Sequence, residues 1–295
     1  MMLKVHEGTS RATRIPASIE ASPQHVLGGK LTASLLPAGT RVYVTDVGVD
    51  PLDDYVAAAG QVRAMGYEPV PHIPVRRVES EAAMESRLRR LRDEANVDDI
   101  LVIAGEADRT MGPFGESLDL LRSGLHDEIG FAHVAVAGHP EGNTAYRDVD
   151  PDGVLAEKAK IARDSDASFR IATQFGFDGP AFVRWSRAVA DAGIDLPIHL
   201  GVAGPAKLTT LIKFAAMCGV GNSLNFLKKR ASAITTLATK HSPEEVVEPI
   251  EKAWAEEDWS HIAGIHVFPF GGLASASEWL AERGSFVFEG HREAV

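Results

Sequence analysis

The first candidate for chemistry in this sequence is a carboxylate at the end of a short apolar segment. Glu20 closes RIPASIE, residues 14–20, and no other charged side chain lies between Ile15 and Pro23. Removing a carboxylate from water favours its protonated form, which suits a general acid. The alternative is a solvated residue in the loop that follows. The residues alone leave both interpretations open.

A second carboxylate stands in the same kind of position. Glu106 ends DILVIAGE, residues 99–106, directly after the small residue Gly105. Its negative charge could repel or stabilise charge on a bound ring, because charges interact strongly where water is excluded. A loop carboxylate paired with Arg109 would explain the same spacing.

The densest group of polar side chains lies in AVAGHPEGN, residues 135–143. His139, Glu141 and Asn143 offer an imidazole, a carboxylate and an amide, and the glycines between them allow close approach of a ligand. A metal site would need further ligands such as His72 and His133. His133 begins its segment, however, and is expected at the opposite end from the others. We therefore predict no metal site.

The segment SFRIATQFGFD, residues 168–178, contains a glutamine that could bind a flat heterocycle. In a strand, Thr173, Phe175 and Phe177 would lie on one side, and Gln174 and Gly176 on the other. A side-chain amide both donates and accepts hydrogen bonds, which suits such a ligand. The alternative is a polar residue that is satisfied within the core.

Two other reactive residue types point to weaker possibilities. Lys207, in GPAKLT, could form a Schiff base, but its place at the start of a helical stretch favours a surface or phosphate-binding role. Cys218, in KFAAMCGVG, is expected to be a buried, inert thiol. As the single cysteine it cannot form an internal disulfide or a thiolate metal site.

These candidates share one arrangement, because nearly every apolar segment ends in a polar or titratable residue. Helix-like stretches separate the segments, which is the pattern of a (β/α)8 TIM barrel, whose chemistry collects at the carboxyl ends of its strands. The eight predicted strands lie within residues 14–20, 41–46, 68–74, 99–106, 133–141, 168–178, 197–204 and 262–272.

Apolar periodicity and end signals predict helices between these strands. Additional helices are expected after the seventh strand, where they often shape a ligand site in this fold. We predict a polar N-terminal arm at 1–13 and a single barrel domain at 14–295. The predicted helices are 50–66, 79–96, 151–167, 180–194, 205–219, 222–240, 242–259 and 275–284.

Composition narrows the class of protein. A hydrophobic fraction of 45% is ordinary for a globular domain, and a net charge of −11 argues against a nucleic-acid partner. No apolar run approaches the roughly 18 to 20 residues that cross a membrane. The N-terminus shows no secretory signal, so a cytoplasmic location is expected. Dinucleotide GxGxxG, phosphate-binding GxxxxGKS and hydrolase GxSxG motifs are missing from the sequence.

Several of these segments together resemble the methylenetetrahydrofolate reductase family of one-carbon metabolism. IATQFGFD is similar to the family's ITQFFFD, and AGHPEGN to its GYPEGHPE. ASIEASP, PHIP and IAGE resemble its SFEFFPP, PHLT and LRGD segments. The matches keep their order from about residue 14 to residue 272.

This resemblance implies a (β/α)8 barrel that reduces 5,10-methylenetetrahydrofolate to 5-methyltetrahydrofolate with NADH or NADPH, the hydride passing through FAD. It makes Glu20 the general acid and Glu106 a second catalytic residue that influences flavin and folate charge. Gln174, Phe175 and Asp178 would contact the folate. The implied cofactor-binding residues are Thr45, His72, Gly105, His139, Asn143 and Lys160.

Some positions depart from the family's pattern. Ala104 replaces the arginine of LRGD, His139 a tyrosine, and Asn143 a histidine. These departures keep open a flavin-free hydride transfer from NADH to the same or a related pterin, and a non-catalytic pterin-binding paralogue. An aldolase that uses Lys207 is a further alternative. The sequence leaves NADH versus NADPH open, and a homo-oligomer is possible in this fold.

Overall fold

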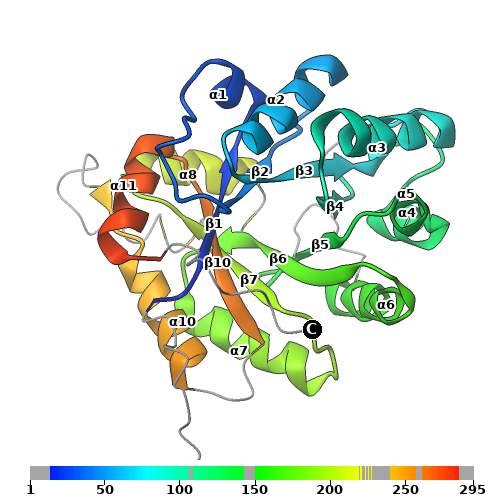
Figure 1. The fold of residues 1–295 in the computed structure, drawn as a ribbon. Helices are drawn as coiled ribbons and strands as arrows, with labels where there is room; N and C mark the ends of the chain where they lie inside the picture. Colours follow the sequence, from blue (N-terminus) through cyan, green and yellow to red (C-terminus); the bar gives the residue numbers. More distant parts are fainter. Residues whose placement is uncertain are drawn as a thin grey trace, which may run out of the picture.

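The computed structural model describes residues 14–105, 109–142, 150–218, 220, 223, 225, 227, 240–256 and 261–285. Within them, eight parallel strands close into a barrel with the neighbour order β1-β10-β7-β6-β5-β4-β3-β2 (Figure 1). The predicted (β/α)8 barrel is thereby confirmed. The barrel strands are β1 (Ala17–Ala21), β2 (Arg41–Val44), β3 (Glu68–Pro74), β4 (Asp99–Ile103), β5 (His133–Gly138), β6 (Ser168–Gly176), β7 (Ile198–Ala203) and β10 (Ile262–Phe268).

Helices surround the barrel, and six of them match predicted segments closely. Their ends have local causes: Ser80 accepts a hydrogen bond from the Ala83 backbone N–H at 3.1 Å before α3, and Asn96 ends that helix with a left-handed φ of 50°. The six helices are α2 (Leu52–Ala64), α3 (Glu81–Ala95), α6 (Pro151–Asp164), α7 (Gly179–Asp191), α10 (Glu244–Glu256) and α11 (Leu273–Arg283).

Shorter elements were not predicted, because they carry too few residues for an apolar period to show. They are α1 (Pro23–Leu27), the 3-10 turn η1 (Val75–Arg77), α4 (Ser117–Ser123) and α5 (Leu125–Ile129). Gly124 separates the last two with a φ of 74°, a conformation that favours glycine.

The chain lengthens after β7, as predicted. β8 (Ala206–Lys207) pairs antiparallel with β9 (Lys240–His241), and α8 (Leu208–Met217) follows β8. The next predicted helix, 222–240, lies almost entirely outside the described residues, as does the predicted arm at 1–13. In the described part of the chain, no helix is both long and apolar enough to cross a membrane.

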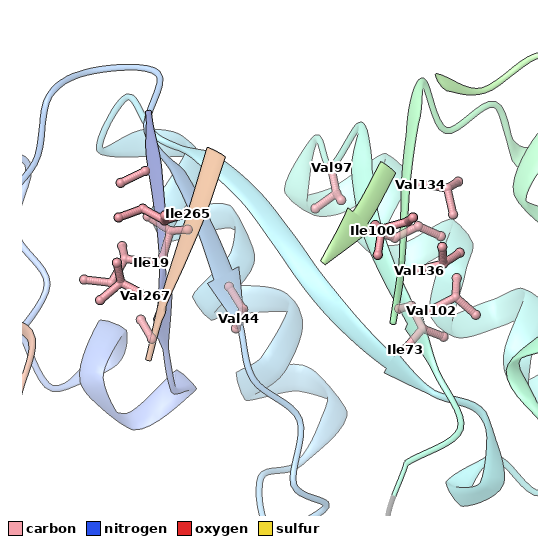
Figure 2. Packing of buried hydrophobic residues seen from close by; sticks show 14 of the residues in the cluster. Ile19, Val44, Ile73, Val97, Ile100, Val102, Val134, Val136, Ile265 and Val267 are labelled. Atoms are coloured by element: carbon pink, nitrogen blue, oxygen red, sulfur yellow. The ribbon is translucent and has the colours of Figure 1, made fainter. Parts of the chain in front are cut away.

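The main hydrophobic core lies between the outer face of the barrel and the helices. Alternate residues of the strands point outward, so that branched side chains of neighbouring strands meet (Figure 2). Ile19, Ile265 and Val267 form one such group, and Val102 and Val136 belong to another. Each is fully buried, which accounts for the β-branched composition of the strands.

The interior of the barrel is unusually polar. Its small apolar cluster includes Tyr43 and Leu101, but beside it lies an ion pair in which Arg170 Nη1 is 2.9 Å from Asp99 Oδ1. Both side chains of the pair are less than 5% exposed. Arg170 also donates to the Tyr43 hydroxyl at 3.0 and 2.8 Å, and Arg41 Nε lies 3.3 Å from Asp99 Oδ2. The interiors of such barrels usually hold branched apolar residues instead.

The buried Arg170–Asp99 pair should contribute much more to the free energy of unfolding than an ion pair at the surface. Asp99→Asn should lower the free energy of unfolding by about 3 to 5 kcal/mol, because it leaves Arg170 charged and without its partner in the barrel. Glu85→Gln, which breaks the exposed Arg89–Glu85 pair on α3, should cost at most about 0.5 kcal/mol. Urea unfolding of both variants measures the difference. Equal effects would show that the interior pair is not a constraint on the fold.

Candidate functional site

Glu20 lies near the carboxyl end of β1, inside the mouth of the barrel. Its side chain is 15% exposed and stands between two imidazoles. Glu20 Oε1 is 3.5 Å from Nε2 of His266 on β10 and 3.8 Å from Nε2 of His72 on β3. A carboxyl group and two imidazoles gathered at one place supply the residue types that general acid–base chemistry uses.

His266 was not predicted as a site residue. Its ring is 2% exposed, and Nδ1 lies 2.9 Å from the Ser18 hydroxyl oxygen. The Tyr43 ring packs against it, with centroids 4.2 Å apart. Two signals in the sequence could have found it. Alternation in IAGIHVF directs this histidine inward, and barrel closure puts its strand beside the strand of Glu20.

His72, a predicted cofactor-binding residue, lies on β3 with Nε2 3.8 Å from Glu20 Oε1. Burial lowers its pKa from the ordinary value, although the charge of Glu20 opposes part of that effect. Its backbone carbonyl accepts a hydrogen bond from the Tyr55 hydroxyl at 2.8 Å, which fixes this part of β3. His72 therefore presents a neutral ring to Glu20 near pH 7.

Gln174 stands in an irregularity of β6. The pairing of β6 with β7 shifts between Ala172 and Phe175, so the strict alternation expected across this segment is broken. Gly201 of β7 accommodates the irregularity, because a Cβ atom there would come within 2.5 Å of the Thr173 carbonyl oxygen. Gln174 is half-buried, and its Oε1 accepts a hydrogen bond from the Phe175 backbone N–H at 3.1 Å.

Phe175, rather than Gln174, is the residue of this segment that is fully packed at the mouth. Its ring centroid lies 5.2 Å from that of Phe268 and 4.8 Å from that of Phe270. Phe270 in turn stacks on Phe214 of α8 at 4.2 Å. We call these four rings the aromatic wall. It meets the site at His266, whose ring centroid lies 5.0 Å from that of Phe268.

Helix α6 places a buried cation next to His139, which lies in the loop after β5. Lys158 of α6 is 3% exposed, and its Nζ lies 3.4 Å from the Ala137 carbonyl oxygen. Burial lowers the pKa of Lys158 to about 8, and burial together with the charge of Lys158 lowers the pKa of His139 to about 4. Lys160 is different: its side chain is 64% exposed and pairs with Glu157 at 2.5 Å.

The remaining predicted residues have varied surroundings. Thr45 is half-exposed at the end of β2, and Gly105 packs its backbone against Pro74. Asp178 caps α7 by accepting from the Ala181 backbone N–H at 2.9 Å, which gives it a structural role. Glu106 and Asn143 lie outside the described residues.

Two other kinds of chemistry, metal binding and Schiff-base formation by Lys207, find no suitable site among the described residues. No group of three or more His, Cys, Asp or Glu side chains there could hold a metal ion. Lys207 is exposed in β8, outside the barrel, and not within a barrel strand. Glu141, from the densest polar segment, accepts a hydrogen bond from the Ser223 backbone N–H at 2.9 Å.

Comparison with models of known protein families gives a match over more than half of the chain. The family model "Methylenetetrahydrofolate reductase" matches residues 62–266. That span includes His72, His139, Gln174 and His266, and it begins after Glu20. Methylenetetrahydrofolate reductase 1 of Schizosaccharomyces pombe is 32% identical over 107 residues, which are 36% of this chain and 17% of that protein. The alignment thus spans a small part of the relative's length.

Solved structures are more distant. Dihydropteroate synthase from Thermus thermophilus is 11% identical, with a TM-score of 0.47 and coverage of 94% of this chain and 96% of that chain. A proline utilization A variant from Bradyrhizobium japonicum is 13% identical, with a TM-score of 0.38 and coverage of 79% and 26%. Neither likeness bears on the chemistry of this chain.

The pKa of His139 predicts a pH dependence of stability. A folded pKa of about 4 lies below the unfolded value of 6.5, so the unfolded chain binds more protons between these pH values and stability falls as pH drops through them. Between pH 7 and pH 5, His139→Gln should remove about 1 to 2 kcal/mol of the loss that the wild-type protein shows. Urea unfolding at both pH values provides the test. Identical losses in the two proteins would contradict it.

Proposed function

The chain belongs to the methylenetetrahydrofolate reductase family, and from this premise we propose that it reduces 5,10-methylenetetrahydrofolate to 5-methyltetrahydrofolate with hydride from NADH or NADPH. The observation that carries the proposal is the position of Glu20, a partly buried carboxyl group between His72 and His266 at the barrel mouth. Opening of the folate's five-membered ring needs a proton donor at such a place.

Protonation precedes hydride transfer in the proposed reaction. Glu20 gives its proton to N10 of the folate as the bond from N10 to the bridging carbon breaks. The bridging carbon remains attached to N5 as an iminium ion, and hydride addition to it produces the methyl group. One proton and one hydride are consumed for each turnover. A general acid in a water-poor mouth contributes about 10²- to 10⁴-fold to such a step.

The aromatic wall and Gln174 are the proposed folate contacts. Phe268 is partly exposed beside His266, and Phe175 packs against it. Aromatic surfaces favour flat heterocycles through stacking and burial. Gln174 uses Oε1 for the Phe175 backbone, which leaves its amide N–H groups as donors to the pterin. Asp178 is a helix cap, and its proposed contact with substrate would share that role.

FAD is the carrier that the resemblance implies, so its fit to the described residues matters. A flavin diphosphate needs cations or strong hydrogen-bond donors. Thr45, His72, Gly105 and His139 carry no positive charge near pH 7, and Lys160 is paired with Glu157 at the surface. Lys158, beside His139, is a buried cation with a pKa of about 8, and it supplies one positive charge against the two negative charges of a flavin diphosphate. Among the described residues, the predicted donor set together with Lys158 therefore does not fit a flavin diphosphate. The steps above are therefore written with the protein's own residues, the folate and a hydride from NADH or NADPH, and none of them passes through FAD.

That mismatch favours direct hydride transfer from the dihydronicotinamide as a second candidate route to the same product. A non-catalytic paralogue is less well supported, because the chain retains Glu20 and Gln174 at the mouth. The exposure of Lys207 outside the barrel also argues against an aldolase.

Replacing the proton donor tests the proposal. Glu20→Gln should lower kcat for folate reduction by about 10²- to 10⁴-fold while the Kd for NADH stays within about twofold, since the change removes a proton and almost no volume. Glu85→Gln on α3 is the matched control and should retain full activity. Turnover by Glu20→Gln within a few-fold of the wild-type value would exclude the assigned role.

The absorbance spectrum of the purified protein distinguishes the two hydride routes. With direct transfer, the protein should lack the visible bands of a flavin, even after incubation with FAD and desalting, and should still oxidise NADH when methylenetetrahydrofolate is added. A yellow protein that NADH bleaches and the folate restores would instead establish FAD as the carrier.

A further inference from the structure

We propose that His266, held by Ser18, is a positioning residue that keeps the Glu20 carboxyl group in place before and after it gives up its proton. This inference rests on the proposed function for its catalytic meaning. Its physical content, a coupling between the Glu20 carboxyl and the His266 ring, can be tested without any turnover.

The two nitrogens of the His266 ring face different groups. Nδ1 lies 2.9 Å from Ser18 Oγ, and Nε2 lies 3.5 Å from Glu20 Oε1. The ring is held between Tyr43, at a centroid distance of 4.2 Å, and Phe268, at 5.0 Å. A ring with contacts at both nitrogens and packing on its faces has little freedom to rotate, so Nε2 stays directed at the carboxyl group.

Ser18 gives this arrangement two stable forms. Its hydroxyl oxygen lies within reach of both His266 Nδ1 and the Ile265 carbonyl oxygen, which is 3.5 Å away. A hydroxyl group can donate one hydrogen bond and accept others. When it donates to Nδ1, Nε2 carries the hydrogen and donates to a Glu20 carboxylate. When it donates to Ile265, Nδ1 carries the hydrogen and Nε2 accepts from a Glu20 carboxylic acid.

A general acid needs a neighbour that can hydrogen-bond to both its protonated and its charged form. Glu20 is protonated before the transfer and charged after it, and an unmet hydrogen-bonding group in a buried place is costly. The Ser18–His266 pair offers a partner to Glu20 in both states. To donate to the resulting carboxylate, the ring changes tautomer after the transfer, with one proton released from Nδ1 to water and one taken up from water at Nε2. Glu20 then faces the same ring in both states and does not need to move.

The other imidazoles in the barrel are less suited to this role. His72 Nε2 is farther from Glu20 Oε1, at 3.8 Å, and makes no hydrogen bond to any described residue. His199 of β7 lies deeper, where burial and then the positive charge of Arg170 lower its pKa well below the ordinary value. Neither has a hydroxyl partner like Ser18 among the described contacts.

If His266 served only to fill space, a variant that keeps its ring would retain activity. Substitutions can therefore distinguish packing from positioning of Glu20. His266→Phe keeps a ring against Tyr43 but removes both nitrogens, whereas His266→Gln keeps an N–H that can reach Glu20. We expect kcat to fall by about 10- to 100-fold in His266→Phe, part of the contribution of a general acid, and KM to change by less than about threefold. His266→Gln should retain markedly more activity, and Ser18→Ala should lose kcat in the same direction.

The double variant makes the kinetic test decisive. If His266 acts through Glu20, His266→Phe should cause no further loss in a Glu20→Gln background, measured at high enzyme concentration. The proposal is overturned if His266→Phe alone stays within about twofold of wild type, or if its loss is the same in both backgrounds. Failure of the wild-type protein to form 5-methyltetrahydrofolate would contradict the proposed function, and a spectroscopic test would then decide this inference.

Nuclear magnetic resonance of ¹⁵N-labelled histidine rings reports the coupling directly. Glu20→Gln and Ser18→Ala should each shift the ring-nitrogen signals of His266 and change its tautomer balance. The signals of His126, a buried ring on α5 near Ser165, are the internal control and should not move. His266 signals that are unchanged in Glu20→Gln would overturn the proposal, whether or not the protein is a reductase.

Discussion

The buried ion pair between Arg170 and Asp99 is the constraint on which the rest of the barrel interior depends. Two charges out of water are tolerated only when each is paired and hydrogen-bonded. Here Asp99 and Tyr43 hold the pKa of Arg170 above its ordinary value even though burial opposes the charge. The guanidinium group then fixes the Tyr43 hydroxyl, and the Tyr43 ring supports His266. The orientation of the imidazole beside Glu20 thus follows from a charge pair deeper in the barrel.

The two faces of the barrel strands therefore differ in composition. The outer face of the strands supplies the large apolar core against the helices, with residues such as Ile19 and Val267. The inner face holds few large apolar groups, and it presents polar side chains from the ion pair up to the mouth. Near His266, the aromatic wall adds apolar surface to this polar interior. A substrate with a flat ring and a basic nitrogen suits this combination of surfaces.

Strand ends were easier to predict from the sequence than side-chain partners. A change from apolar to polar residues marks nearly every strand end, so Glu20 could be expected at the carboxyl end of its strand, and barrel closure follows from eight such segments. The irregularity in β6 could not be foreseen, because it arises from pairing with β7 and moves Phe175 to the packed position. To identify His266 from the sequence, the alternation in IAGIHVF had to be combined with the closure of β10 against β1, which no single segment shows by itself. Likewise, only the packing of α6 decides that Lys158 is the buried lysine of that helix.

The most direct test of the account is to measure product and reductant in the same sample. Purified wild-type protein would be incubated with NADH or NADPH and 5,10-methylenetetrahydrofolate without oxygen, and 5-methyltetrahydrofolate would be quantified beside the oxidised nicotinamide. The account predicts that the two form in a one-to-one ratio and that neither forms when Glu20 is replaced by glutamine. Absence of the methyl product with both nucleotides would contradict it.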